Sequence, residues 1–264
     1  MEILGFLFAI IIGLVMGLIG GGGSILSVPV LVYLFHYDAV TATAYSLFIV
    51  GISSFVGSVG FMKNKQVNFN TALLFGLPSI LGVLFSRRIV LPHLPHYIIN
   101  KWGIVLTKET FLLLLFSVLM IISSYKMIKK INEHKLFKAQ DTNYTLLISQ
   151  GLLVGIITGL IGAGGGFLIV PALVMLLKVS MKEAVATSLF IIALNSLIGF
   201  SSSLDSILVD WTFLLLFSSL SVLGILMGVL LSKKIEGKKL KPIFGWFVLI
   251  MGIYVILRET IFQS

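Results

Sequence analysis

Two glycine clusters are the residues of this sequence best suited to binding a ligand. Each cluster lies within an apolar stretch, where glycine costs about 1 kcal/mol relative to alanine in a helix interior, so both predict a helix break. The backbone N–H groups exposed by a break, together with a helix N-terminus, form a site suited to an anion. The candidate binding residues in the clusters are Gly20, Gly21, Gly22, Gly23, Ser24, Gly162, Ala163, Gly164, Gly165 and Gly166.

A polar helix face follows each cluster and supplies side chains to the same candidate site. Residues seven apart on a helix share a face, and seven residues separate Ser46 from Ser53 and Ser188 from Asn195. Their hydroxyl and amide groups could complete the hydrogen bonds of a bound anion. The alternative is structural: close helix packing for the glycines and interhelical hydrogen bonds for the polar side chains. The candidates on this face are Ser46, Ser53, Thr187, Ser188 and Asn195.

Other ligand chemistries find little support. The run Gly20–Gly23 is followed by Ser-Ile-Leu, whereas a phosphate-binding loop requires Gly-Lys followed by Ser or Thr. We expect no acidic or basic residue in the middle of a long apolar run, which argues against a cation site there. His93 and His96 are expected in a surface loop and not in a metal site. We therefore predict neither an enzyme nor a metal or cofactor site.

The composition places these residues in a membrane protein. The chain of 264 residues is 58% hydrophobic and 11% charged, and its mean hydropathy is +1.12. A helix needs about 20 apolar residues to cross a bilayer, and most of the runs approach that length. The formal net charge of +9 is assigned to loops that contact lipid headgroups, and not to nucleic-acid binding. The apolar runs are 3–19, 24–35, 41–61, 71–91, 109–125, 145–161, 166–177, 184–204, 212–232 and 243–257.

An internal repeat relates the two glycine clusters. Residues 17–57 align without a gap to residues 159–199, at an offset of 142, with 20 identities in 41 positions. Farther along, "GVLFSRRI" at 82–89 resembles "GVLLSKKI" at 228–235, which changes the offset to 146. We therefore predict a first membrane repeat over 1–126, a linker over 127–144 and a second repeat over 145–264.

The Lys and Arg residues predict how the two repeats are oriented. If the halves are inverted, 14 of these residues lie on one side of the membrane and 5, including Arg87 and Arg88, on the other; parallel halves give 8 and 11. Basic residues favour cytoplasmic loops, so we predict inversion, with both termini outside and the linker in the cytoplasm. After each break a short helix is expected to start near Pro29 or Pro171.

The predicted fold is therefore an all-α polytopic membrane protein of two inverted five-segment repeats. Their first helices are broken by glycine and are partly re-entrant. Such inverted repeats are common in secondary transporters, whose substrate sites lie near the middle of the membrane, where the halves meet.

The sequence also resembles a known family of membrane transporters. "GLIGGGGSILSVPVL" with "TATAYSLFI", repeated as "GLIGAGGGFLIVPALVML" with "AVATSLFI", is similar to the sulfite exporter TauE/SafE family. The resemblance implies a small anion as substrate, such as sulfite, a sulfonate or another organosulfur compound. We expect alternating-access transport in the cell (inner) membrane, coupled to a proton or sodium ion. The alternatives are a passive anion channel and a non-transporting membrane scaffold.

Overall fold

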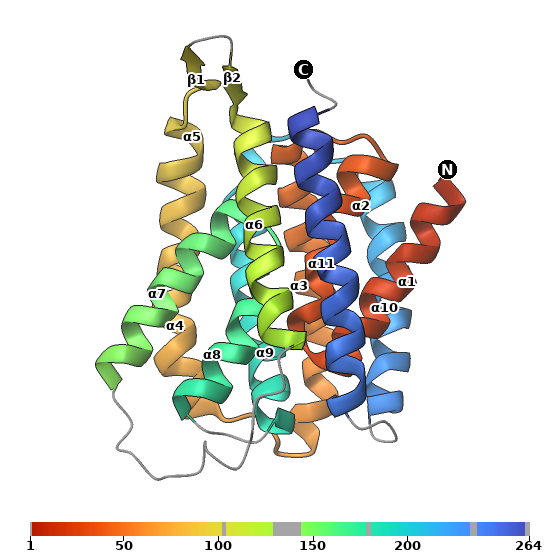
Figure 1. Ribbon diagram of the computed structural model, residues 1–264. Helices are drawn as coiled ribbons and strands as arrows, with labels where there is room; N and C mark the ends of the chain where they lie inside the picture. Colours follow the sequence, from red (N-terminus) through yellow and green to blue (C-terminus); the bar gives the residue numbers. More distant parts are fainter. Residues whose placement is uncertain (1, 102–103, 129–143, 178–180, 233–236, 262–264) are drawn as a thin grey trace.

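Long helices make up most of the molecule (Figure 1). The computed structural model describes residues 2–101, 104–128, 144–177, 181–232 and 237–261. Its first part contains α1 (Glu2–Ile19), the 3₁₀-helix η1 (Gly21–Leu26), α2 (Ser27–Leu34), α3 (Ala39–Lys63), α4 (Phe69–Phe85), the π-helix η2 (Ser86–Val90), α5 (Leu91–His93), strands β1 (Tyr97–Lys101) and β2 (Ile104–Thr107), and α6 (Lys108–Ile128). Its second part contains α7 (Tyr144–Ile161), α8 (Gly166–Leu177), α9 (Met181–Ser201), the 3₁₀-helix η4 (Leu204–Ser206), α10 (Trp211–Ser232) and α11 (Gly237–Ile261).

The predicted all-α polytopic membrane fold is confirmed. Each of the ten apolar runs coincides with a helix, and six helical stretches in the described residues are long and apolar enough to cross a membrane. Large apolar side chains, including Leu81, Leu230 and Ile250, lie exposed on the outside of the bundle. Such a surface suits lipid and not water.

A short β-hairpin lies where the sequence analysis expects only a loop. Strands β1 and β2 pair antiparallel and lie at the top of Figure 1, between α5 and α6. His93 ends α5, with its Nδ1 atom 2.7 Å from the carbonyl oxygen of Ile89. In the ranges that the structure describes, no three His, Cys, Asp or Glu side chains are grouped to hold a metal ion.

Glycines bring the helices of the two halves into backbone contact. A Cβ added to Gly13 of α1 would lie 1.9 Å from the carbonyl oxygen of Ser221 in α10. A Cβ on Gly155 of α7 would lie 2.0 Å from the carbonyl oxygen of Ser79 in α4. Only glycine allows helices to approach this closely, so Gly13 and Gly155, which lie outside the two clusters, serve helix packing. The first long helix of each half therefore packs on the fourth apolar segment of the other half.

Equivalent contacts in the two halves differ by 142 in residue number throughout. The packing therefore does not follow the offset of 146 that the sequence alignment uses from residue 82 on. A Cβ on Gly82 would lie 2.4 Å from the carbonyl oxygen of Leu152, and one on Gly224 would lie 2.1 Å from that of Ile10. Since 224 − 82 and 152 − 10 both equal 142, the two contacts are counterparts at the original offset. A shift of four residues is about one helical turn, which leaves a residue on nearly the same face and makes the shifted alignment plausible in sequence.

Hydrogen bonds at the starts of α4 and α10 correspond in the same way. The backbone N–H of Asn68 donates to Thr187 Oγ1 at 3.0 Å, and that of Asp210 donates to the hydroxyl of Tyr45 at 2.6 Å. The donors differ by 142 in number, and so do the acceptors. Thr187, predicted as a binding residue, therefore has a structural partner at the start of α4.

The halves run in opposite directions in the view of Figure 1. Helix α1 starts in the upper part and descends, and α2 lies near the top; α7 starts at the bottom and rises, and α8 lies near the bottom. Each short helix thus lies towards the side from which its preceding long helix enters. This arrangement is compatible with two inverted repeats with re-entrant first helices. The inversion and the repeat boundaries at 126 and 145 stay predictions.

Candidate functional site

The first glycine cluster breaks the chain between α1 and η1. Gly20 has φ 81° and ψ −149°, a conformation that side chains disfavour, and it ends the helix that precedes it. Helix α2 then starts at Ser27, so Pro29 falls in its first turn. The predicted order of helix, glycine break and short helix starting near the proline is confirmed in this half.

The second cluster makes a tighter turn than predicted. Gly162, Gly164 and Gly165 have φ angles of 74°, 63° and 74°. These left-handed residues reverse the chain within residues 162–165, so α8 starts at Gly166, five residues before Pro171. The expectation of a helix starting near Pro171 is therefore wrong. In the first cluster Gly20 has this conformation, and residues 21–26 form a 3₁₀-helix instead.

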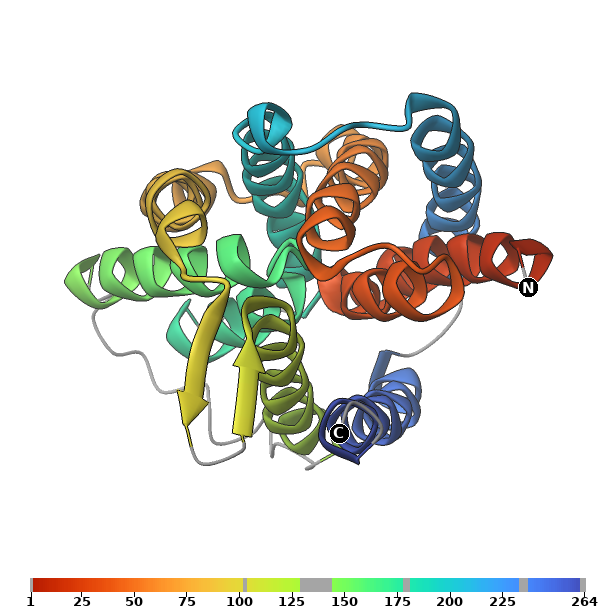
Figure 2. The same ribbon diagram turned by 90° about the horizontal axis from the view of Figure 1, so that it is seen from above.

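The two breaks meet near the middle of the bundle. Figure 2 shows α1, in red, and α7, in green, approaching this point from opposite sides. A Cβ on Gly21 would lie 2.1 Å from Gly166 Cα, and a Cβ on Gly166 would lie 2.1 Å from Gly21 Cα. Gly21 and Gly166 therefore approach each other without space for a side chain between them.

Serines of the first half hydrogen-bond around its break. Ser24 Oγ donates to the carbonyl oxygen of Gly21 at 2.6 Å, and Ser27 Oγ donates to that of Ser24 at 2.6 Å. Ser46 Oγ lies 2.5 Å from Ser27 Oγ, which ties α3 to the start of α2. The structure thus brings the predicted residues Ser24 and Ser46 together at one end of the first break.

In the second half the equivalent hydroxyl behaves differently. Ser188 Oγ donates to the carbonyl oxygen of Val185, one turn earlier in its own helix, at 2.9 Å. The position equivalent to Ser27 is Ile169, which has no hydroxyl to offer Ser188. The two breaks therefore have related backbones but different polar surroundings.

Ser53 and Asn195 form a matched pair of bonds between halves. Ser53 Oγ donates to Ser221 Oγ at 2.9 Å, and Asn195 Nδ2 donates to Ser79 Oγ at 2.6 Å. Donors and acceptors again differ by 142, so the same contact is made twice. In this conformation both predicted residues hold helices together across the interface of the halves.

Two further serines, absent from the predicted set, have buried hydroxyls without partners, and one of them lies against the second break. Ser54 and Ser196 are fully buried equivalents at the offset of 142, and neither Oγ atom has a hydrogen-bond partner. A Cβ on Gly164 would lie 2.6 Å from Ser196 Oγ, which places that hydroxyl against the second break. The sequence does contain a signal for them, because both serines recur in register within the repeat.

Arg87 corrects an expectation about charge. The sequence predicts a loop position for this residue, but the structure places it in η2, inside the helical stretch Phe69–His93, with 3% of its surface exposed. Its Nε, Nη1 and Nη2 atoms have no hydrogen-bond partner. The neighbouring Arg88 is exposed. Arg87 lies near the end of this stretch, so the expectation of no charge in the middle of a long apolar run is not contradicted, but its assignment to a loop is wrong.

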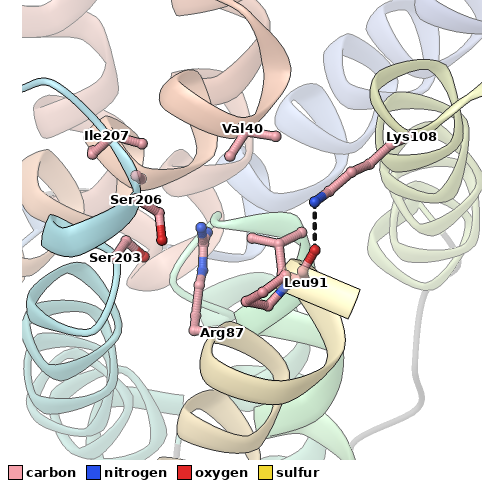
Figure 3. A pocket seen from close by; sticks show the side chains of 9 residues that line it. Val40, Arg87, Leu91, Lys108, Ser203, Ser206 and Ile207 are labelled. Carbon is pink, nitrogen blue, oxygen red and sulfur yellow. Dashed lines mark hydrogen bonds between the residues drawn. The ribbon is translucent and has the colours of Figure 1, made fainter. Parts of the chain in front are cut away.

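A pocket of about 60 Å³ surrounds this arginine (Figure 3). In that view the side chain extends from its helix towards Val40, with Ser203 and Ser206 on one side and Lys108 on the other. The Lys108 ammonium donates to the carbonyl oxygen of Leu91. The full lining comprises Val40, Ala44, Arg87, Leu91, Pro92, Lys108, Ser203, Ser206 and Ile207.

Similarity to known proteins covers nearly the whole chain. Residues 5–255 match the family described as "Sulfite exporter TauE/SafE". A probable membrane transporter protein of Methanocaldococcus jannaschii is 26% identical over 266 residues, covering 94% of each chain. The probable membrane transporter protein YunE of Bacillus subtilis is 28% identical over 282 residues, covering 98% of this chain and 99% of its own. No solved structure matches the chain.

The family and its named members agree with the six apolar helical stretches. The prediction of a multi-pass membrane transporter, and not an enzyme, is therefore confirmed. The glycine breaks that suggested the resemblance lie within the matched residues, as does Arg87. The chain belongs to the sulfite exporter TauE/SafE family.

Proposed function

We propose that this transporter carries a small anion, an oxidised sulfur compound such as sulfite or a sulfonate, across the cell (inner) membrane by alternating access. The substrate class follows the description of the family. A proton or sodium gradient is the proposed driving force, and the bilayer and the anion are the proposed partners. The glycine breaks and the hydroxyls beside them form the proposed substrate site in the open state.

One observation carries this proposal: the two helix breaks touch, and a repeated pair of buried serines, one of which lies against the second break, has unpaired hydroxyls. Gly21 meets Gly166, and the buried Oγ atoms of Ser54 and Ser196 have no partner. A buried hydroxyl without a partner costs roughly 1–3 kcal/mol, so a second state in which a ligand or water pairs it is favoured. We infer that the centre is a binding site in its closed form.

The groups at this centre suit an anion better than a cation. The atoms nearest to a Cβ built on Gly20 or Gly164 belong to Val170, Val185, Ser196, Val50 and Ile192, and none of these described residues is acidic. Hydroxyls and backbone N–H groups can donate to an oxyanion, whereas a cation site in a membrane usually needs a carboxylate.

Alternating access explains why the breaks are closed. The gap between Gly21 and Gly166 does not admit even a methyl group, so an anion between them requires the halves to separate. Much of the interface between the halves consists of contacts that are made twice, once in each direction. Equivalent contacts favour a rocking motion with two related end states, as in other transporters built from inverted repeats.

The test is sulfite flux into proteoliposomes containing a Ser54→Ala and Ser196→Ala double variant. The removed hydroxyls have no partner in the closed form, so folding should be unaffected. Losing two hydrogen bonds to the substrate, each about 1 kcal/mol, should reduce flux about tenfold or more. A matched control is Ser123→Ala with Ser218→Ala, which removes two other buried, unpartnered hydroxyls and should leave flux unchanged.

Three results would contradict the proposal. Undiminished flux in the Ser54 and Ser196 double variant would remove these hydroxyls from the substrate site. Flux that neither saturates with sulfite nor responds to a proton or sodium gradient would indicate a channel. Absence of anion flux with the unmodified protein would favour the scaffold alternative.

A further inference from the structure

The guanidinium of Arg87 lacks a counter-charge. It is 97% buried, as its 3% exposure implies, and no described residue accepts a hydrogen bond from it. An arginine remains protonated in proteins, so this position carries a full positive charge. Burying a charge is unfavourable unless it is paired, and the pocket lining contains no acidic residue to pair with it.

The pocket has the size and access needed for a small ion. About 10–15 Å³ measured in this way holds one water molecule, so the pocket of about 60 Å³ holds a few water-sized groups. Pro92 and Ser206 are exposed, which connects the pocket to the surface at the end of the bundle where α11 also ends. Lys108 adds a second positive charge to the same wall.

We propose that this pocket binds a small oxyanion through the guanidinium of Arg87. A planar guanidinium donates two parallel hydrogen bonds to an oxyanion, a geometry that an ammonium does not provide. Lys108 and Ser206 lie within the pocket wall and complete the polar surroundings of the ion. The pocket lies between α3, the α4–α5 stretch, α6 and the segment that joins α9 to α10, so it is separate from the contact between Gly21 and Gly166.

The local helix geometry supports a dedicated site. Arg87 lies in a π-helical segment, and such segments occur frequently at functional sites because they redirect side chains. At the offset of 142 the equivalent residue is Val229, so the corresponding place in the other half carries no charge. The charge at Arg87 is therefore not a general requirement for packing this helix.

The oxyanion has two sources at a membrane surface: a free ion or the phosphate of a lipid headgroup. The deep burial of the guanidinium and the size of the pocket favour a free ion, because a lipid phosphate carries two ester substituents into the same space. Binding of either source is independent of whether the protein transports the ion.

The experiment measures thermal unfolding of the full-length protein in nonionic detergent during titration with sulfite or sulfate. The unmodified protein and Arg88→Gln should show the same saturable rise in Tm. Arg87→Gln should need an ion concentration about tenfold higher or more for half of the effect, because charge-assisted hydrogen bonds are lost. Without added ion, its Tm should equal or exceed that of the unmodified protein, whereas a purely structural arginine would lower it.

Variants and lipids separate this site from other interpretations. The Ser54→Ala and Ser196→Ala double variant should retain the ion-dependent rise, which assigns the rise to the Arg87 pocket even if the proposed transport fails. An unchanged titration in Arg87→Gln would overturn the proposal; if that variant does not fold, an unchanged titration in Lys108→Gln would do so. In nanodiscs, loss of the effect on adding phosphatidylglycerol to phosphatidylcholine would identify a headgroup phosphate as the bound oxyanion, and an unchanged effect a free ion.

Discussion

At the scale of single residues, Gly164 combines a left-handed backbone with crowded surroundings. Its φ of 63° is unfavourable for any residue with a Cβ, and a Cβ there would lie 2.6 Å from both Ser196 Oγ and Val50 Cγ1. Gly76 in α4 is a matched contrast, because a Cβ there would meet its nearest neighbour, Ile191, at an ordinary 3.6 Å.

We predict that Gly164→Ala lowers the free energy of unfolding by roughly 2 kcal/mol, from the left-handed backbone and the crowding together. Gly76→Ala should be neutral or slightly stabilising, since alanine favours a helix. Thermal unfolding of both variants in detergent measures the difference. Equal Tm values for the two variants would show that the turn at residues 162–165 does not need its left-handed glycines.

The sequence reveals some site residues and hides others for physical reasons. Glycine runs are visible because their cost within a helix demands an explanation, and the repeat places Ser46 and Ser188 beside them. Whether a buried hydroxyl is used depends on which helix lies opposite, as the different partners of those two serines show. Arg87 was missed because an Arg-Arg pair at the end of an apolar run is typical of a loop.

At the scale of elements, paired helices are held by glycines that face backbone. Gly224 of α10 lies against α1, and Gly82 of α4 lies against α7 in the equivalent way. Apolar periodicity predicts each helix but not its neighbour, because lipid-facing and protein-facing surfaces are both apolar. The pairing of α1 with α10, across the halves, was therefore not foreseen from the sequence.

We predict that Gly224→Val and Gly82→Val lower Tm by similar amounts. The Cβ of the new side chain would lie 2.1 Å or 2.4 Å from a facing carbonyl oxygen, so each variant forces its helix pair apart. Gly60→Ala is the control, because a Cβ there would lie 3.8 Å from Val229. The measurement is thermal unfolding in detergent. A lower Tm in only one of the two valine variants would argue against equivalent packing of the two helix pairs.

At the scale of the whole molecule, the fold class and the ten helical segments followed from composition and run length alone. The orientation in the membrane rests on where the basic residues lie. Arg87 is buried and is not a loop residue, so 4 of the 5 basic residues first assigned to the outer side remain there. The predicted excess of basic residues on the cytoplasmic side therefore increases.

We predict that the α9–α10 connection faces the outside and that the 127–144 linker faces the cytoplasm. The chain has no cysteine, so single substitutions report cleanly. A membrane-impermeant maleimide applied to intact cells should label Leu208→Cys, whose native residue is 97% exposed, and should label Asn132→Cys only after permeabilisation. The reverse labelling pattern would indicate the opposite orientation in the membrane. Labelling of both cysteine variants in intact cells would contradict the assignment of the two segments to opposite sides.

The difference between Arg87 and Val229 has a kinetic consequence. The buried guanidinium of Arg87 places a fixed positive charge beside one mouth that the equivalent residue, Val229, does not supply beside the other, so the two mouths differ in how they attract anions. Half-saturating substrate concentrations should then differ between influx and efflux, and the difference should shrink at high ionic strength. The net direction of transport still depends on the gradients, so transport would be reversible. One face would be half-saturated at a low substrate concentration and the other at a higher one.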